Sequence, residues 1–340
     1  MLDVRKMALL RELARLGTIA AVAEAQFCTP SAVSQQLSAL EREAGVPLLR
    51  RNGRGVALTA AGVDLAERTE GVLALLEEAA AALASARTDL VGELRIGVFP
   101  TAVHTLLPTA LRELSAAYPR LDLHVTELDP AYVPDALRGG RLDIALVHEY
   151  DYVPSEPDPA LVTEPLLTER VYLASAAALA LGVGGQGADP ILAGRDQPWI
   201  VGSPDTLCHL MAIRLCQAAG YTPRIRHYAN DFAGVLTLVA AGQGVAVVPE
   251  LALAACPDEV TLAVLPARRR TLIACRRGGD GHPAIAACAA ALRSAAASQS
   301  WRSARWPAPQ RPGQDIARPD TGSGSPGSLA VPWLGISPGR

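Results

Sequence analysis

Residues 18–42 hold the pattern that most narrows what this chain can fold into, namely two short helices joined by a tight corner. Thr29 can cap the second helix with its hydroxyl, and Pro30 suits the first helical position, where no backbone N–H is needed. Apolar residues then recur at spacings of four and three, which predicts one buried face. These residues are Val33, Leu37 and Leu40.

The opposite face of this second helix is polar and nearly uncharged, with Ser31, Ser34, Gln35 and Ser38. Short hydroxyls and an amide offer donors and acceptors that suit base edges in a DNA groove. Together with Thr29 they are the candidate base-contacting residues. An amphipathic helix in a bundle has the same periodicity, so this segment alone leaves both interpretations open.

Residues 45–59 predict a β-hairpin, because Asn52 and Gly53 lie between two apolar runs. Three arginines, Arg50, Arg51 and Arg54, lie near its tip. Arginines beside a base-reading helix suit phosphate contacts, although a solvated turn would carry them equally well. The helix pair and the hairpin together predict a winged helix-turn-helix, with Arg51 and Arg54 as candidate phosphate contacts.

Four longer segments of the chain carry motifs of one known protein family, in that family's order. They are T-P-S-A-V-S-Q-Q-L at 29–37, L-T-A-A-G at 58–62, L-R-G-G-R-L-D-I-A-L-V at 137–147 and V-A-A-G-Q-G-V-A-V-V-P at 239–249. With these segments the chain resembles the LysR-type transcriptional regulators over roughly residues 2–295. One position departs, since Gln26 stands where that family usually has a core leucine. We expect Phe27 or Cys28 to supply the missing apolar side chain.

Residues 59–86 predict one long helix, dense in alanine and free of proline. Apolar residues repeat at heptad spacing at Leu65, Val72, Ala79 and Ala86, with Leu76 and Leu83 alongside. Such a stripe on a projecting helix needs a partner, which is either the same chain or a second copy. The resemblance implies a second copy, and hence a homodimer or homotetramer.

Residues 91–297 alternate short β-rich runs with helical stretches, which predicts an α/β domain with a doubly wound parallel sheet. The sequence suggests two lobes, and the chain passes from one to the other twice. Strands near 260–265 and 271–275 are expected to return to the first lobe. The resemblance implies a type 2 periplasmic-binding-protein-like fold. The expected division is a DNA-binding domain at 1–58, a linker helix at 59–90, lobe I at about 91–165 and 266–297, and lobe II at about 166–265.

A small-molecule effector is expected between the two lobes, at the carboxyl ends of the strands. The candidate lining residues are Thr101, Glu127, His148, Ser203 and Asn230. Thr101 and Ser203 precede predicted helices, so their hydroxyls suit an anionic group, or they simply cap those helices. Glu127 and His148 would instead favour an amine.

Charge is distributed unevenly along the chain. Residues 1–60 carry eight basic and five acidic side chains, whereas residues 61–300 carry eighteen basic and twenty-seven acidic ones. A mildly basic head on an acidic body is consistent with contacts to double-stranded promoter DNA at one end of the molecule.

Other features favour no cofactor, no metal and no catalysis. None of the six cysteines forms a C-x-x-C pair, and Cys208 and Cys216, eight apart on one predicted helix, would form a redox pair only with refolding. Residues 182–187 match G-x-G-x-x-G, but neither a preceding strand nor a following helix supports a nucleotide site. Residues 298–340, rich in proline, glycine and serine, are expected to be disordered.

Two other classes of protein share part of this pattern. A solute-binding protein of a transporter has the same two-lobed shape, but the N-terminus shows no secretion signal, and no apolar run reaches the length of a membrane span. We therefore expect a cytoplasmic protein. An enzyme with a DNA-binding head is the more distant alternative.

Overall fold

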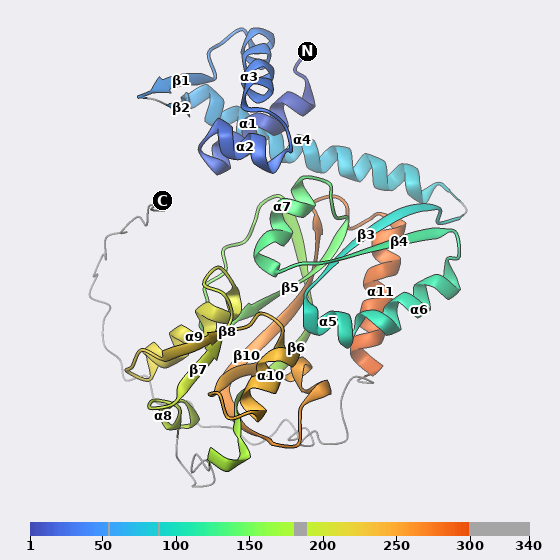
Figure 1. Ribbon diagram of the computed structural model, residues 1–340. Helices are drawn as coiled ribbons and strands as arrows, with labels where there is room; N and C mark the ends of the chain where they lie inside the picture. The colour runs from blue at the N-terminus through green and yellow to red at the C-terminus, as the bar shows by residue number, and fades with distance from the viewer. Residues whose placement is uncertain (54, 88, 180–188, 299–340) are drawn as a thin grey trace, which may run out of the picture. The chain divides into compact units, whose positions relative to one another are not determined.

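The computed structural model describes residues 1–53, 55–87, 89–179 and 189–298 (Figure 1). The expected disordered tail and the G-x-G-x-x-G match therefore lie outside the described residues, except for residue 298. No helix in the described ranges is long and apolar enough to cross a membrane.

The N-terminal head contains three helices and a hairpin: α1 (Val4–Leu16), α2 (Ile19–Ala25), α3 (Pro30–Ala44), β1 (Leu49–Asn52) and β2 (Gly55–Leu58). Each helix begins at a side-chain cap, from Asp3, Thr18 and Thr29 respectively. The head has a core of its own, whose fully buried members include Leu10, Val22, Val33 and Leu40. The predicted winged helix-turn-helix is confirmed.

The corner between α2 and α3 differs from the expectation. Phe27 is 78% exposed and Cys28 is also exposed, so the prediction that one of them enters the core is wrong. Backbone hydrogen bonds hold the corner instead, from the Gln26 N–H to the Val22 carbonyl and from the Cys28 N–H to the Ala23 carbonyl, each 2.9 Å. Phe27 adopts a left-handed conformation with φ 51°.

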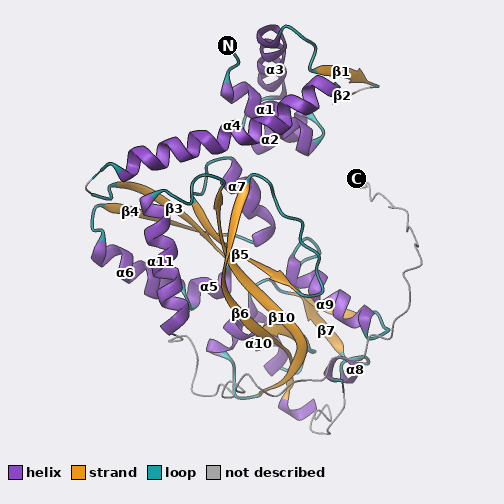
Figure 2. Cartoon of the chain, turned by 180° about the vertical axis from the view of Figure 1, so that it is seen from behind, coloured by secondary structure: helices purple, strands orange, loops and turns teal. Residues whose placement is uncertain are grey.

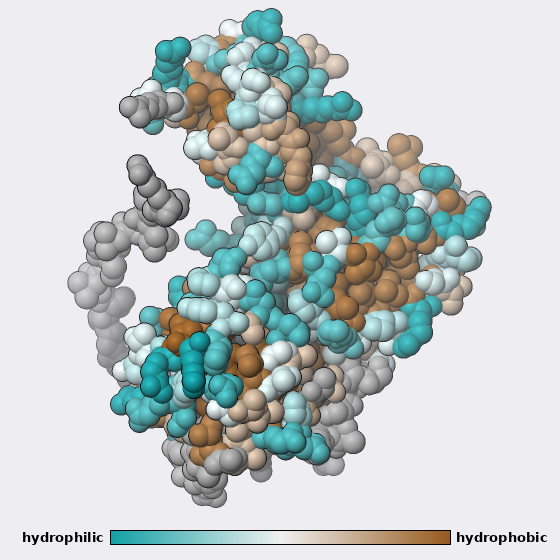
Figure 3. Space-filling model, viewed as in Figure 1, coloured by the Kyte–Doolittle hydropathy of each residue, from teal (hydrophilic) through white to brown (hydrophobic). Residues whose placement is uncertain are grey.

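Helix α4 (Ala60–Ser85) is the predicted long helix, capped by Thr59. Its first half packs on the head through Leu65, Ala66 and Val72. Farther along, Leu76 and Leu83 are 50% and 75% exposed. The space-filling view shows apolar residues among hydrophilic ones in the part of the molecule where Figure 1 places α4 (Figure 3).

A six-stranded sheet in the order β4-β3-β5-β10-β6-β9 forms the centre of the C-terminal region (Figure 2). Its first three strands are parallel, β3 (Gly92–Val98), β4 (Leu121–Glu127) and β5 (Ile144–Tyr150). Helices α5 (Pro100–His104), α6 (Leu107–Ala117) and α11 (Pro283–Ser298) share one apolar core against this sheet. Helix α7 (Val133–Arg138), which follows the short turn η1 (Pro130–Tyr132), packs in a separate cluster with Ala145, Leu161 and Ala274.

Two long strands belong to both lobes. β6 (Leu161–Ala176) and β10 (Val260–Arg276) are antiparallel to one another, and β10 is also antiparallel to β5. The two strands expected near 260–265 and 271–275 are therefore one strand, with an irregularity between Val264 and Arg268. The sheet is mixed rather than wholly parallel, because β10 runs opposite to both of its neighbours, β5 and β6.

The second lobe adds a smaller parallel pair, β7 (Pro198–Val201) and β8 (Arg224–Tyr228). Around it lie α8 (Pro190–Ala193), α9 (Leu207–Ala218), α10 (Phe232–Ala240), β9 (Ala246–Pro249), and the turns η2 (Ala177–Leu179) and η3 (Glu250–Ala255). Trp199 is fully buried in this lobe, and its indole N–H donates to the Gly194 carbonyl at 2.9 Å. The predicted two-lobed α/β class is confirmed.

Candidate DNA-binding surface and inter-lobe pocket

Helix α3 presents the predicted base-contacting residues on one exposed face. Ser31, Ser34, Gln35 and Ser38 are all exposed, while the apolar residues of the same helix are buried. Thr29 is exposed as well, and its Oγ1 accepts a hydrogen bond from the Ala32 N–H at 3.2 Å. One lone pair of that hydroxyl is therefore used to start the helix. The face carries no formal charge, so it offers hydrogen bonds rather than ion pairs.

The wing carries the exposed arginines beside this face. Strands β1 and β2 are antiparallel, with Asn52 opposite Gly55, and Gly53 has φ 58° at the turn. Arg51 is exposed, and none of the described carboxylates forms an ion pair with it. Arg54 lies outside the described residues. An exposed guanidinium without an acidic partner is free to bind phosphate.

A buried ion pair lies where the two lobes meet. Arg269 Nε is 2.7 Å from Glu169 Oε1, and both side chains are 1% exposed. Arg269 also donates to Thr101 Oγ1 at 3.1 Å and lies over the Phe99 ring. Burial raises the pKa of Glu169, although the Arg269 charge opposes that shift. Thr101 is thus buried and bonded rather than open to a ligand.

Sequence reasoning missed both Arg269 and Glu169. The available signal was the run Arg268-Arg269-Arg270 in a strand, because alternation sends the middle side chain to the opposite face. Its partner is 100 residues away, and no local pattern indicates it.

His148 is adjacent to this pair and has no hydrogen-bond partner among the described atoms at either ring nitrogen. Its ring contacts the edges of Phe99 and Tyr150, at centroid distances of 4.9 Å and 5.2 Å. Burial, followed by the Arg269 charge, lowers the pKa of His148 well below its usual value. The imidazole is therefore neutral near pH 7, with one donor and one acceptor unused.

A cavity of about 400 Å³ includes His148 in its lining. Apolar side chains line much of it, among them Pro130, Pro134, Val147, Leu161, Leu207 and Leu272, and Glu149, Glu156, Asp158 and Arg277 add charged groups. Leu207 belongs to α9 of the second lobe, whereas Pro130 and Pro134 belong to the first. The cavity has the volume and composition of a site for a small organic molecule.

The other predicted effector residues divide into separate groups. Asn230 Oδ1 accepts from the Ser203 N–H at 2.7 Å, so these two lie together in the second lobe. Asn230 also lines a second, smaller cavity of about 20 Å³ with Asp129 of the first lobe. Glu127 is exposed at the end of β4, and no described contact connects it to the others.

An exposed hydrogen bond joins the lobes at their boundary. Tyr132 Oη of the first lobe donates to Asp205 Oδ2 of the second at 2.7 Å. Cys208, which lines the smaller cavity just beyond Asp205, has its Sγ 3.5 Å from Tyr150 Oη. Burial raises the pKa of the Cys208 thiol.

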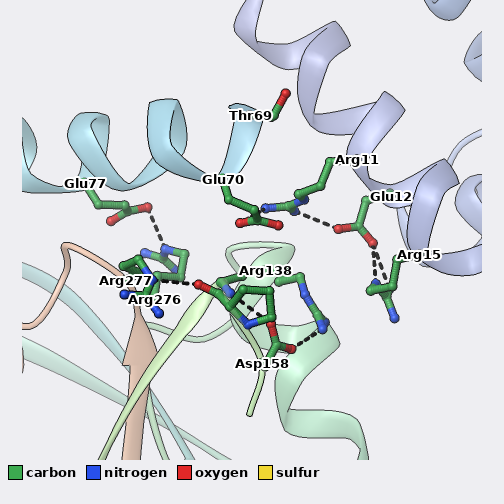
Figure 4. A network of polar contacts seen from close by, with 12 residues as sticks. Arg11, Glu12, Arg15, Thr69, Glu70, Glu77, Arg138, Asp158, Arg276 and Arg277 are labelled. Carbon is green, nitrogen blue, oxygen red and sulfur yellow. Dashed lines mark hydrogen bonds and ion pairs between the residues drawn. The ribbon is translucent and has the colours of Figure 1, made fainter. Parts of the chain in front are cut away.

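A polar network connects the head and α4 to the first lobe (Figure 4). Glu12 accepts from Arg11 and Arg15, each at 2.7 Å, and Arg15 also reaches Asp135 Oδ1 at 2.9 Å. Glu77 of α4 accepts from Arg276 Nε at 2.6 Å. Burial alone would raise the pKa of Glu12, but its hydrogen bonds to Arg15 and Arg11 lower it overall.

Comparison with known proteins gives consistent matches. Residues 4–63 match the family model of the bacterial regulatory helix-turn-helix protein, lysR family, and residues 87–297 match the LysR substrate binding domain. A probable hydrogen peroxide-inducible genes activator of Streptomyces viridosporus is 37% identical over 71% of this chain and 78% of its own length. The regulator ClcR of Pseudomonas putida is 28% identical over 76% of this chain and 86% of its own. A cysteine mutant of OxyR from Corynebacterium glutamicum has a TM-score of 0.53 at 25% identity, covering 88% of this chain and 95% of that one.

Proposed function

This chain belongs to the LysR family of bacterial transcription regulators, and we propose that it reads base edges in the major groove through the exposed face of α3. The single observation that carries this assignment is the uncharged, donor-rich face formed by Ser31, Ser34, Gln35 and Ser38. Arg51 of the wing would contact phosphates beside it, together with Arg54. The proposed domain division is the one expected from the sequence, with the head at 1–58, the linker at 59–90 and the two lobes at 91–297.

Two substitutions separate base reading from phosphate binding. Gln35→Ala is expected to relax discrimination at one base position by about 1–3 kcal/mol, since one base contact is lost. Arg51→Ala is expected to weaken binding to all sequences alike and to reduce the salt slope by about one. Binding titrations over several salt concentrations, on a selected site and its single-base variants, distinguish the two. Equal loss on every sequence for Gln35→Ala would contradict its assignment to base reading.

The effector is proposed to be a small organic molecule with an apolar part and a polar group. The cavity of about 400 Å³ supports this class, because apolar side chains such as Leu207 and Leu272 line it together with charged ones such as Asp158 and Arg277. Thermal-shift screening of such compounds against the full-length protein and an Arg277→Ala variant tests the assignment, because the variant removes one charge from the lining. A compound that stabilises both proteins equally would place its site elsewhere.

A response to hydrogen peroxide is the alternative function that the name of the Streptomyces relative suggests. The environments of Cys208 and Cys216 do not favour a thiol-based response. Burial raises the pKa of Cys208, and it raises that of Cys216 to about 11. Since the thiolate is the reactive form, neither thiol is activated in this conformation. We therefore propose ligand binding, without catalysis, in a protein that acts on DNA in the cytoplasm.

A further inference from the structure

The segment Pro47–Leu49, where the chain enters the wing, is held to α3 by one carboxylate of that helix. Glu41 Oε1 accepts hydrogen bonds from the Leu48 N–H at 2.9 Å and from the Leu49 N–H at 3.0 Å. Leu49 is the first residue of β1, the strand that leads to Arg50 and Arg51. An anionic acceptor makes such backbone hydrogen bonds shorter and stronger than a neutral one does.

Helix α4 holds the same segment from the other side. The Thr59 N–H donates to the Leu48 carbonyl, and Thr59 Oγ1 donates to the Pro47 carbonyl, each at 2.9 Å. Gly62 lies so close that a Cβ there would be 2.2 Å from the Leu48 oxygen. The Leu48 side chain is 2% exposed in the head core. Glu41 therefore closes the one side of this segment that faces α3.

We infer that Glu41 is a positioning residue for DNA binding, which sets the wing arginines at a fixed place relative to the base-reading face of α3. This inference rests on the proposed function. Glu41 lies on the same helix as Gln35 and Ser38. Its carboxylate therefore fixes the start of β1 relative to the base-reading face of that helix. Without it, the start of the wing keeps its bonds to Thr59 and the packing of Leu48 in the head core, but it loses both hydrogen bonds from α3, so the wing arginines are less well fixed relative to the base-reading face.

Charge alone gives a different expectation, because an acidic residue near DNA repels phosphate. Glu43 provides the matched control, since it lies on the same helix and pairs with Lys6 and the Asp3 N–H rather than with the wing. Glu43→Ala removes the same charge from α3 without touching Pro47–Leu49. Both variants remove one negative charge from α3, so the difference between their affinities for DNA excludes the general effect of that charge.

The test uses the full-length protein and the duplex most enriched by wild-type protein in a selection from random DNA. We expect Glu41→Ala to bind about tenfold more weakly than Glu43→Ala and with a salt slope smaller by about one, because a wing contact to phosphate is lost. Hydrogen exchange at the Leu48 and Leu49 amides should accelerate, while the Leu37 amide stays protected. Equal affinity and equal salt slope for Glu41→Ala and Glu43→Ala would overturn the inference.

Two further variants decide the matter even if Glu41→Ala unfolds the head. Glu41→Gln loses the charge but keeps an oxygen at the same reach, so binding should stay within about threefold of wild type. Glu41→Asp keeps the charge but withdraws the carboxylate by one methylene, so it should lose affinity as Glu41→Ala does. The reverse order would show that charge, not position, is what matters. A wild-type protein that enriches no duplex would instead contradict the proposed function.

Discussion

Phe27 holds the most strained backbone position among the described residues other than glycine, with φ 51° at the corner before α3. A left-handed conformation costs an L-residue about 1–2 kcal/mol, and asparagine is among the few residues that tolerate it. The Phe27 ring gains little in return, because it is 78% exposed, with the Arg141 guanidinium 5.3 Å from its centroid.

Replacing Phe27 with asparagine should therefore stabilise the head. Phe27→Ala is the matched control, because it loses the same ring and the same contact to Arg141 but keeps the unfavourable backbone. We expect the asparagine variant to unfold with a free energy about 0.5–1 kcal/mol higher than that of the alanine variant. Urea unfolding of both variants measures the difference, and equal stabilities would show that the corner carries no strain.

His148 is expected to make stability depend on pH. Its pKa is lowered well below 6.5 in the folded protein, so the unfolded chain takes up a proton first as the pH falls. Stability is then fully present above the unfolded pKa and decreases below it, by at most about 1.4 kcal/mol per pH unit. Urea unfolding between pH 7 and 5 should show a steeper decrease for wild type than for His148→Gln. Parallel curves would mean that His148 takes up its proton equally in the folded and unfolded states.

Single residues also mark the limit of prediction from sequence. The polar face of α3 could be predicted because helical periodicity is local, and so could the cap at Thr29. The burial of Arg269 could not, because its partner Glu169 is 100 residues away and its neighbours in the chain are also arginines. The exposed Phe27 was misassigned because backbone hydrogen bonds, which carry no side-chain pattern, hold that corner.

Among the single elements, α4 has two halves with different surroundings. Its first half belongs to the core of the head, and its second half exposes Leu75, Leu76 and Leu83 at 65%, 50% and 75%. On its other side the turn at Gly278 packs against it so closely that a Cβ at Gly278 would lie 2.3 Å from the Ala74 carbonyl. The face toward the lobe is therefore already occupied, which leaves the leucine stripe for a second subunit.

Introducing charge into that stripe should weaken self-association without unfolding the chain. We expect Leu76→Glu and Leu83→Glu together to raise the dissociation constant of the oligomer at least about tenfold, because apolar contacts between subunits are replaced by like charges. Ser85→Glu adds a charge at an exposed position on the opposite side of α4 from Leu76 and serves as control. Sedimentation over a concentration series measures the change. An unchanged oligomer in the double variant would place the subunit contact elsewhere.

The strand pattern shows what element-level prediction can reach. The parallel units of the first lobe follow from alternating strand and helix signals, and they are present as β3, β4 and β5. The sequence predicts two strands where β10 is one, because the charged run at Arg268–Arg270 interrupts its apolar sequence. A strand that turns one charged residue inward and pairs it across the sheet is not distinguishable from a loop by polarity alone.

At the scale of the whole molecule, a few contacts at the boundary between the lobes hold them together. The hydrogen bond from Tyr132 to Asp205 is exposed, so its contribution to holding the lobes together is modest. The buried pair of Arg269 and Glu169 lies deeper, on strands that both lobes share. Opening should therefore begin at Tyr132.

Removing the Tyr132 hydroxyl should let the lobes separate more often. We expect Tyr132→Phe to increase the rate of maleimide labelling at Cys208 about two- to fivefold, since a single exposed hydrogen bond is lost. Cys216, which is fully buried, should stay unreactive, and the exposed Cys28 provides an internal reference. Tyr118→Phe is the control away from the boundary. The same Cys208 labelling rate in all three proteins would show that this hydrogen bond does not restrain the lobes.

The position of β10 in the sheet also bears on how the chain is synthesised. β10 lies between β5 and β6, although it is the last of the six strands to leave the ribosome. Until residues 260–276 are translated, β5 and β6 have no partner between them, and the first lobe also lacks α11. The head needs only residues near the start of the chain, so it can fold during translation while the sheet waits. A ribosome stalled before residue 260 would therefore present a folded head on an unfinished ligand-binding region.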